Sequence, residues 1–176
     1  PFMSDLVWIE HVGARGFQAL QKQATDPTLK EIYGWFHVEE QRHAKAELAL
    51  MRRWAMLKPG EVPYANTSIR FAMDWLERYA DDQPMIVLGT IIPLLETALD
   101  GALLKFLLDE VHDPLCHAVF ERINNDESRH LAVDFHVLGE LRPDGGGSPW
   151  LRVARGLKPA LLLGGHARVG LEDNLY

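Results

Sequence analysis

The chain has 176 residues, 47% of them hydrophobic, which predicts one soluble domain with a core of ordinary size. Lys and Arg number 18 against 25 Asp and Glu, and the net charge of −7 argues against a nucleic-acid binder, which would present a basic surface. A single cysteine, Cys116, excludes an internal disulfide and a thiolate metal cluster and favours a reducing, cytoplasmic location. Apolar runs are shorter than the ~18 residues that a membrane-spanning helix needs, so no membrane span is expected.

Apolar residues recur at helical spacing along most of the chain, so we expect an all-α fold. The expected helices cover, in chain order, residues 4–24, 26–57, 68–80, 81–111 and 113–142. Four of them are long, and the short one lies in the segment that connects the two halves. A glycine-rich break at 144–147 then divides a domain over 1–143 from an extension over 144–176. Within the extension, 149–163 predicts a basic amphipathic helix, for which packing across the other helices is favoured over a role at a membrane surface.

One phrase of the form acidic-Glu-x-Arg-His occurs twice, at 39–43 and at 126–130, 87 residues apart. Each phrase follows an Asp-Pro pair, which is a typical helix start because Asp caps the helix and Pro suits its first turn. Asp26 stands 14 residues before the central glutamate of the first phrase, and Asp113 stands 14 residues before that of the second. The repetition predicts two helical hairpins built on one pattern.

The glutamate and histidine of each phrase project from one face of their helix, because three residues advance an α-helix by about 300°. Each pair can therefore hold one metal ion. A further glutamate lies 30 residues upstream of the first pair and 31 upstream of the second, on a different helix. Four helices would then supply the donor set of the di-iron and di-manganese carboxylate proteins. The predicted metal ligands are Glu10, Glu40, His43, Glu96, Glu127 and His130.

Glu96 is the most informative of these residues, because it interrupts a strongly apolar segment at 86–104. A lone carboxylate buried there would cost several kcal/mol or retain its proton, and a dication removes that cost. Four carboxylates and two divalent ions cancel in charge, and two neutral imidazoles leave the balance unchanged. Mostly oxygen donors with one nitrogen per ion favour two Fe ions, with Mn or a mixed Mn/Fe pair as the alternative, and disfavour structural zinc.

Four charged residues next to the predicted ligands in the sequence are candidates for contacts that orient these ligands. We expect Glu39 and Asp126 to hydrogen-bond across the helices to the histidine of the other half, and Arg42 and Arg129 to neutralise these acids. Solvated surface charges are the alternative for all four. Glu47 and Asp134, each seven residues after a ligand glutamate, are candidates either for proton relay or for solvated helix ends. His37 is interpreted as a satisfied helix histidine and is excluded from the ligands.

Together, these residues resemble the ferritin-like diiron-carboxylate superfamily over about 4–142, and the doubled phrase is similar to those of soluble acyl carrier protein desaturases and p-aminobenzoate N-oxygenases. The resemblance implies a ferritin-like four-helix bundle with a crossover segment and a C-terminal extra helix. It also implies a di-iron centre that activates dioxygen to oxidise, oxygenate or desaturate a small organic substrate, with electrons from a reductase or ferredoxin. Neither specific reaction is transferred, because Ile123 and Leu99 replace a histidine and a threonine of the two relatives.

Two other functions stay open at the level of sequence. A ferroxidase or iron storage protein would use the same centre within a cage, whereas an oxygenase is expected as a monomer or homodimer. A metal-free interaction bundle would bind no metal at all. Metal content and assembly size separate the three.

Overall fold

The computed structural model describes residues 2–141, apart from the side chains of 98–102, and all regular elements within this range are helices. The expected all-α class is confirmed for this range. The extension over 144–176, with the helix predicted at 149–163, lies outside the described residues. Among the described helices, none has the length and apolar character to cross a membrane.

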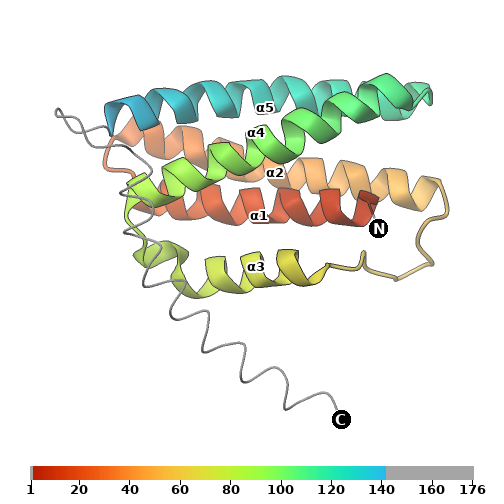
Figure 1. Cartoon of the computed structure of the whole chain (residues 1–176), viewed down its shortest axis with the longest axis horizontal. Coiled ribbons are helices and arrows are strands. Elements are labelled where there is room, and N and C mark those ends of the chain that lie inside the picture. The colour runs from red at the N-terminus through yellow and green to blue at the C-terminus, as the bar shows by residue number, and fades with distance from the viewer. Residues whose placement is uncertain (1, 142–176) are drawn as a thin grey trace, which may run out of the picture.

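The two predicted hairpins are present as two pairs of long antiparallel helices. Figure 1 shows α1, α2, α4 and α5, which we call the four-helix core, lying side by side, while α3 lies outside them along α1. The chain colours show that α2 and α5 run in opposite directions. The elements are α1 (Phe2–Gln23), α2 (Pro27–Arg53), α3 (Thr67–Tyr79), a short 3-10 helix η1 (Ala80–Asp82), α4 (Met85–Glu110) and α5 (Pro114–Glu140).

The two helices that carry the repeated phrase begin in the same way. The Asp26 side chain accepts a hydrogen bond from the Leu29 amide at 2.8 Å, and that of Asp113 accepts one from the Cys116 amide at 2.8 Å. Each cap satisfies an amide that the first helical turn leaves without an intrahelical acceptor. Because both helices start at the same register, the two phrases fall on equivalent turns of α2 and α5.

The C-terminal end of α2 differs from the expectation. The prediction extended this helix to residue 57, but it ends at Arg53, and Ala55 adopts a left-handed φ of 54°. The Met56 amide donates to the Met51 carbonyl at 2.9 Å, and the Ala55 amide donates to the Arg52 carbonyl at 3.1 Å, which is a Schellman closure. The early turn brings Leu57 against the core, so burial outweighs continued helix formation.

Apolar side chains pack in two clusters at the two ends of the four-helix core. One includes Leu6, Leu50, Leu104 and Phe120, and the other includes Phe17, Leu20, Tyr33, Phe36 and Leu88. Along each long helix, the predicted ligands lie between residues of one cluster and residues of the other. The buried polar residues therefore occupy a middle layer with apolar packing on both sides.

Candidate metal centre

All six predicted ligands lie in this middle layer, and each is between 0% and 5% exposed. They form two donor sets, and within each set one ligand atom of every residue lies within 4.8 Å of the others. The sets are Glu10, Glu40, His43 and Glu127, and Glu40, Glu96, Glu127 and His130. Since Glu40 and Glu127 belong to both, the geometry offers two adjacent cation positions that share two carboxylates.

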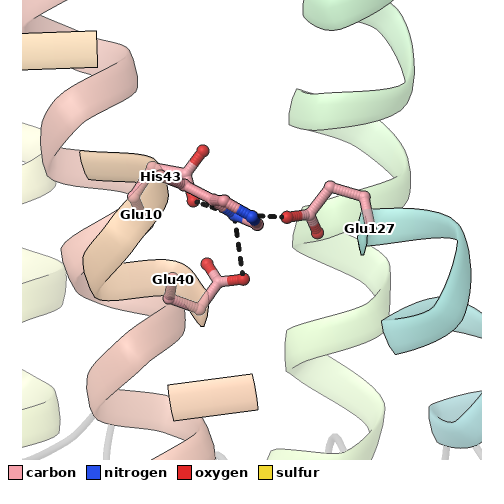
Figure 2. Close-up of side chains that lie close together, drawn as sticks. All are labelled: Glu10, Glu40, His43 and Glu127. Atoms are coloured by element: carbon pink, nitrogen blue, oxygen red, sulfur yellow. Dashed lines mark ion pairs between the residues drawn. The ribbon is translucent and has the colours of Figure 1, made fainter. Parts of the chain in front are cut away.

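His43 is the centre of the first donor set, shown in Figure 2. Its Nδ1 atom lies 3.0 Å from Glu127 Oε1, 3.3 Å from Glu10 Oε2 and 3.8 Å from Glu40 Oε1. These groups come from α1, α2 and α5, so the site exists only when the two hairpins pack together. One imidazole nitrogen and three carboxylates converge on one small volume.

The second donor set mirrors the first. Nδ1 of His130 lies 3.0 Å from Glu40 Oε1 and 3.3 Å from Glu127 Oε2. Glu96 on α4 completes the set, as Glu10 on α1 completes the other. The ring centroids of His43 and His130 are 6.1 Å apart. Because Glu40 and Glu127 approach both Nδ1 atoms, they stand where bridging carboxylates would bind two ions.

The outer nitrogens of both histidines face an acid from the opposite half of the chain. His43 Nε2 lies 3.3 Å from Asp126 Oδ2, and His130 Nε2 lies 3.0 Å from Glu39 Oε2. The structure therefore contains the crossed contacts that the sequence predicts. When the imidazole is neutral, an acceptor at Nε2 favours the tautomer with its proton there, which leaves the Nδ1 lone pair available to a cation held by the carboxylates.

Arg129 forms ion pairs with both Glu39 and Asp126. Its guanidinium lies 2.9 Å from Glu39 and 2.8 Å from Asp126, and Arg122 adds a longer contact of 3.5 Å to Asp126. The prediction that Arg42 also neutralises these acids is wrong, because Arg42 is exposed and has no ion pair within residues 2–141. Arg129 already pairs with both acids, so its counterpart extends into solvent.

Burial and mutual repulsion raise the pKa of two carboxylates of the centre; for Glu127, burial also acts to raise the pKa, but its contacts with His130 and His43 outweigh burial and lower that pKa to about 2. Burial raises the pKa of Glu10 and of Glu40, and the neighbouring carboxylates Glu10 and Glu127 raise that of Glu40 further. Burial lowers the pKa of His43, but its contacts with Glu10 and Glu127 outweigh this effect and raise that pKa to about 11. Four carboxylates thus lie where only protons or cations can offset their charge.

Several inward atoms are left without a hydrogen bond inside the described part of the chain. They are His43 Nδ1, His130 Nδ1, Glu40 Oε1 and both carboxylate oxygens of Glu127. Carboxylate oxygens approach both Nδ1 atoms, yet none is aligned as a hydrogen-bond acceptor. An unsatisfied buried polar atom costs about 1–3 kcal/mol, and coordination would satisfy all of these at once. The residues present therefore fit bound metal ions.

Other residues near the centre refine the sequence interpretation. Glu47 is 0% exposed and Asp134 is 1% exposed, so the alternative of solvated helix ends is wrong for both. His37 Nδ1 lies 2.7 Å from the Ala14 carbonyl oxygen, which agrees with its interpretation as a satisfied histidine. Sequence reasoning missed Tyr33, which is fully buried in the apolar cluster on one side of this layer. Its position seven residues before Glu40, two turns along the same helix face, was the available signal.

Comparisons with protein-family models, with curated proteins and with solved structures gave no match. The assignment of a metal site therefore depends on the position, burial and charge of these side chains. The two overlapping donor sets are the central observation.

Proposed function

We propose that this chain is a ferritin-like, non-haem diiron oxidoreductase that activates dioxygen. The observation that carries the proposal is the pair of donor sets joined by Glu40 and Glu127. Two shared carboxylates, one terminal carboxylate for each ion and one imidazole for each ion are typical of carboxylate-bridged dinuclear sites in helical bundles. A structural site for a single ion would not need two symmetric sets.

Iron is the preferred metal. The donors are oxygen-rich, with a single imidazole for each ion, which suits iron or manganese. Two divalent ions would cancel the charge of Glu10, Glu40, Glu96 and Glu127 while the imidazoles stay neutral. Manganese or a mixed Mn/Fe pair satisfies the same argument and is the alternative.

Each side chain has a distinct role in this proposal. Glu40 and Glu127 would bridge the ions, Glu10 and Glu96 would each bind one ion, and His43 and His130 would bind as neutral ligands. Two ferrous ions held in this way supply electrons for the reduction of dioxygen. Glu39 and Asp126 hold the Nε2 protons of the histidines and so keep the Nδ1 atoms available. The apolar clusters on both sides of the layer exclude water from it.

The reaction class is oxidation, oxygenation or desaturation of a small organic substrate. Two ferrous ions provide two electrons, so repeated turnover requires an external donor, and a reductase or ferredoxin would serve. A cytoplasmic location provides the reducing conditions in which ferrous iron is available.

The direct test is metal loading followed by exposure to dioxygen. Protein loaded anaerobically with Fe(II) is expected to bind two ions per chain and to consume dioxygen rapidly when mixed with it. Glu40→Ala and Glu127→Ala each remove a shared ligand and are expected to lose both ions, whereas Glu10→Ala and Glu96→Ala retain one. Glu31→Gln, on the exposed face of α2, is the matched control and should bind two ions.

Two results would contradict the proposal. Failure of the wild-type chain to bind Fe(II) or Mn(II) would overturn the metal centre itself. Assembly into a large shell that accumulates ferric mineral, measured by size-exclusion chromatography and iron content, would replace the oxygenase with the storage function. A monomer or dimer that oxidises only stoichiometric iron supports the oxidoreductase.

A further inference from the structure

A basic surface covers the outer side of α2. The chain has a net charge of −7, yet every exposed charged residue of α2 from Ile32 onward is basic. None of these residues forms an ion pair within the described part of the chain. They are Arg42, Lys45, Arg52 and Arg53. Their charge is therefore directed at solvent and not at neighbouring helices.

Two apolar side chains continue this surface toward the start of α2. Trp35 is 59% exposed and Val38 is 40% exposed. Trp35, Val38 and Arg42 are spaced i, i+3 and i+7, so they share one face of the helix, and Lys45 follows three residues later. We call these four residues the basic row. An exposed tryptophan beside arginine is typical of the residues that anchor protein interfaces.

Arginines of α5 lie beside the basic row. Arg129 pairs with Glu39, which follows Trp35 by one turn, so its half-exposed guanidinium lies next to the row. Arg122 has a side chain that is 74% exposed and contacts Asp126 on the same side of α5. The surface shared by α2 and α5 therefore presents positive charge from both helices.

The exposed acids of α5 do not offset this charge. Glu121 lines a groove with Leu108 and His112, so it lies toward α4. Glu140 is in the last turn of α5, about three turns beyond Arg129. Neither carboxylate lies among the arginines, so the positive surface is continuous.

The same surface provides a short route from solvent to both histidines of the proposed metal centre. His130 Nε2 lies 3.0 Å from Glu39, and His43 Nε2 lies 3.3 Å from Asp126. Both acids pair with Arg129. One acid and one exposed arginine thus connect each histidine to solvent. At the two ends of the middle layer, apolar clusters separate the centre from solvent instead.

We infer that the basic row and the adjoining arginines of α5 form the docking surface for an acidic protein that donates single electrons to the metal centre. Such docking rests on the function proposed above, which requires an external electron donor. A docked donor loses one electron and one ferric ion becomes ferrous, so two encounters restore the two ferrous ions.

Charge and position together favour this partner. Opposite charges steer the encounter and orient the partner, so a basic surface on an acidic chain selects a protein with a negative face. Electron transfer slows steeply with distance, and a donor on this surface stands over the acids that contact both histidines. Nucleic acid and anionic lipid share the negative charge but supply no electrons to the centre.

The first test measures docking itself. The probe is an acidic [2Fe–2S] ferredoxin in its oxidised form, titrated into the iron-loaded full chain by calorimetry. Binding should weaken at least ~10-fold as salt rises from about 0.02 M to about 0.2 M. Reversal of two charges by Arg42→Glu with Lys45→Glu should weaken it at least ~10-fold at low salt, and Trp35→Ala at least ~5-fold.

A matched variant separates the surface from net charge. Arg78→Glu with Lys105→Glu reverses two exposed charges on α3 and α4, and so changes the net charge equally. This control should bind ferredoxin as the wild type does. Every variant should still bind two iron ions, because none of the altered residues belongs to a donor set.

The second test measures electron transfer. Stopped-flow absorbance follows the loss of ferric absorption when the oxidised protein is mixed anaerobically with reduced ferredoxin. The double variant of the basic row should be reduced at least ~10-fold more slowly than its matched control. Dithionite, a small reductant, should reduce the two variants at the same rate, which shows that the centre itself is intact.

The outcomes separate docking from the proposed function. Equal ferredoxin binding by the two double variants, or equal reduction rates, overturns the docking surface and leaves the oxidoreductase intact. Tighter binding of phosphatidylglycerol vesicles or duplex DNA than of ferredoxin, abolished by Arg42→Glu with Lys45→Glu, would replace the electron donor with that partner. A chain that binds no iron overturns both proposals.

Discussion

His130 Nε2 lies 3.0 Å from Glu39 Oε2, although the two residues are 91 positions apart, and the equivalent contact joins His43 to Asp126. Each half of the chain thus orients the histidine of the other half. Because these contacts assign the Nε2 proton, Glu39→Gln and Asp126→Asn are expected to weaken Fe(II) binding by about 10- to 100-fold. Anaerobic titration with Fe(II) measures this, with Glu31→Gln as the control. Unchanged affinity in both variants would show that the crossed contacts do not support the ligands.

Arg129 and Arg42 occupy equivalent positions in the repeat but have different surroundings. Arg129 is 51% exposed and pairs with both Glu39 and Asp126, so Arg129→Gln should destabilise the protein by about 1 kcal/mol, near the upper end for exposed pairs. Arg42→Gln should stay within about 0.5 kcal/mol of wild type, as expected for a surface residue. Urea unfolding of the metal-free protein measures both. Equal effects would mean that the two arginines are interchangeable.

Gly13 gives α1 room to approach the centre. A Cβ atom at this position would overlap Glu40 Oε2, so Gly13→Ala should displace a shared ligand and reduce Fe(II) binding by tenfold or more, although alanine favours helix by about 1 kcal/mol. Gly34→Ala is the matched control, because its methyl group would meet only the side-chain amide of Gln21. Iron stoichiometry and circular dichroism distinguish a displaced ligand from a disrupted helix. Normal iron binding by Gly13→Ala would contradict the expected overlap.

Asp81 joins η1 to α1 through a pH-dependent ion pair. Lys22 Nζ lies 2.6 Å from one carboxylate oxygen and an Arg15 nitrogen 3.1 Å from the other, and these contacts lower the pKa of Asp81 below its ordinary 3.8. Because the pKa of Asp81 is lower in the folded protein than in the unfolded chain, the charged carboxylate stabilises the fold above pH 3.8. This stabilisation is lost as the pH falls through the pKa of Asp81 in the folded protein.

Asp81→Asn should therefore cost about 0.5 kcal/mol near neutral pH, since the pair is largely exposed, and the difference should vanish in acid. Unfolding curves at several pH values test this, with the neighbouring Asp82→Asn as the control. A difference that persists in strong acid would point to a cause other than charge.

Ala55 closes α2 in a conformation that favours glycine. Its φ of 54° is costly for a residue with a Cβ atom, so Ala55→Gly should raise the free energy of unfolding by about 0.5–1 kcal/mol. Ala49→Gly, within the same helix and on its exposed face, should have the opposite sign because glycine weakens helix interiors. Thermal unfolding of the two variants gives the comparison. Destabilisation by both would mean that the left-handed turn is not retained in solution.

The ligand set was readable from the sequence because helix geometry itself brings its members together. Residues three apart share a face in any α-helix, and the capping residues Asp26 and Asp113 set both phrases at one register. Glu96 stood out since a carboxylate rarely interrupts an apolar helix without a partner. These signals are local, or repeat with a fixed spacing, so the all-α class and the six clustered residues followed without knowledge of the packing.

Only the tertiary structure decided which contacts form where the sequence allows several. The stacking of Tyr33 on Phe17, for example, depends on how α1 and α2 pack together. The choice of Arg129 over Arg42, and the end of α2 at Arg53, likewise follow from how much space and burial the neighbouring elements offer. Such choices depend on distances between segments far apart in the chain, and periodicity carries no information about them.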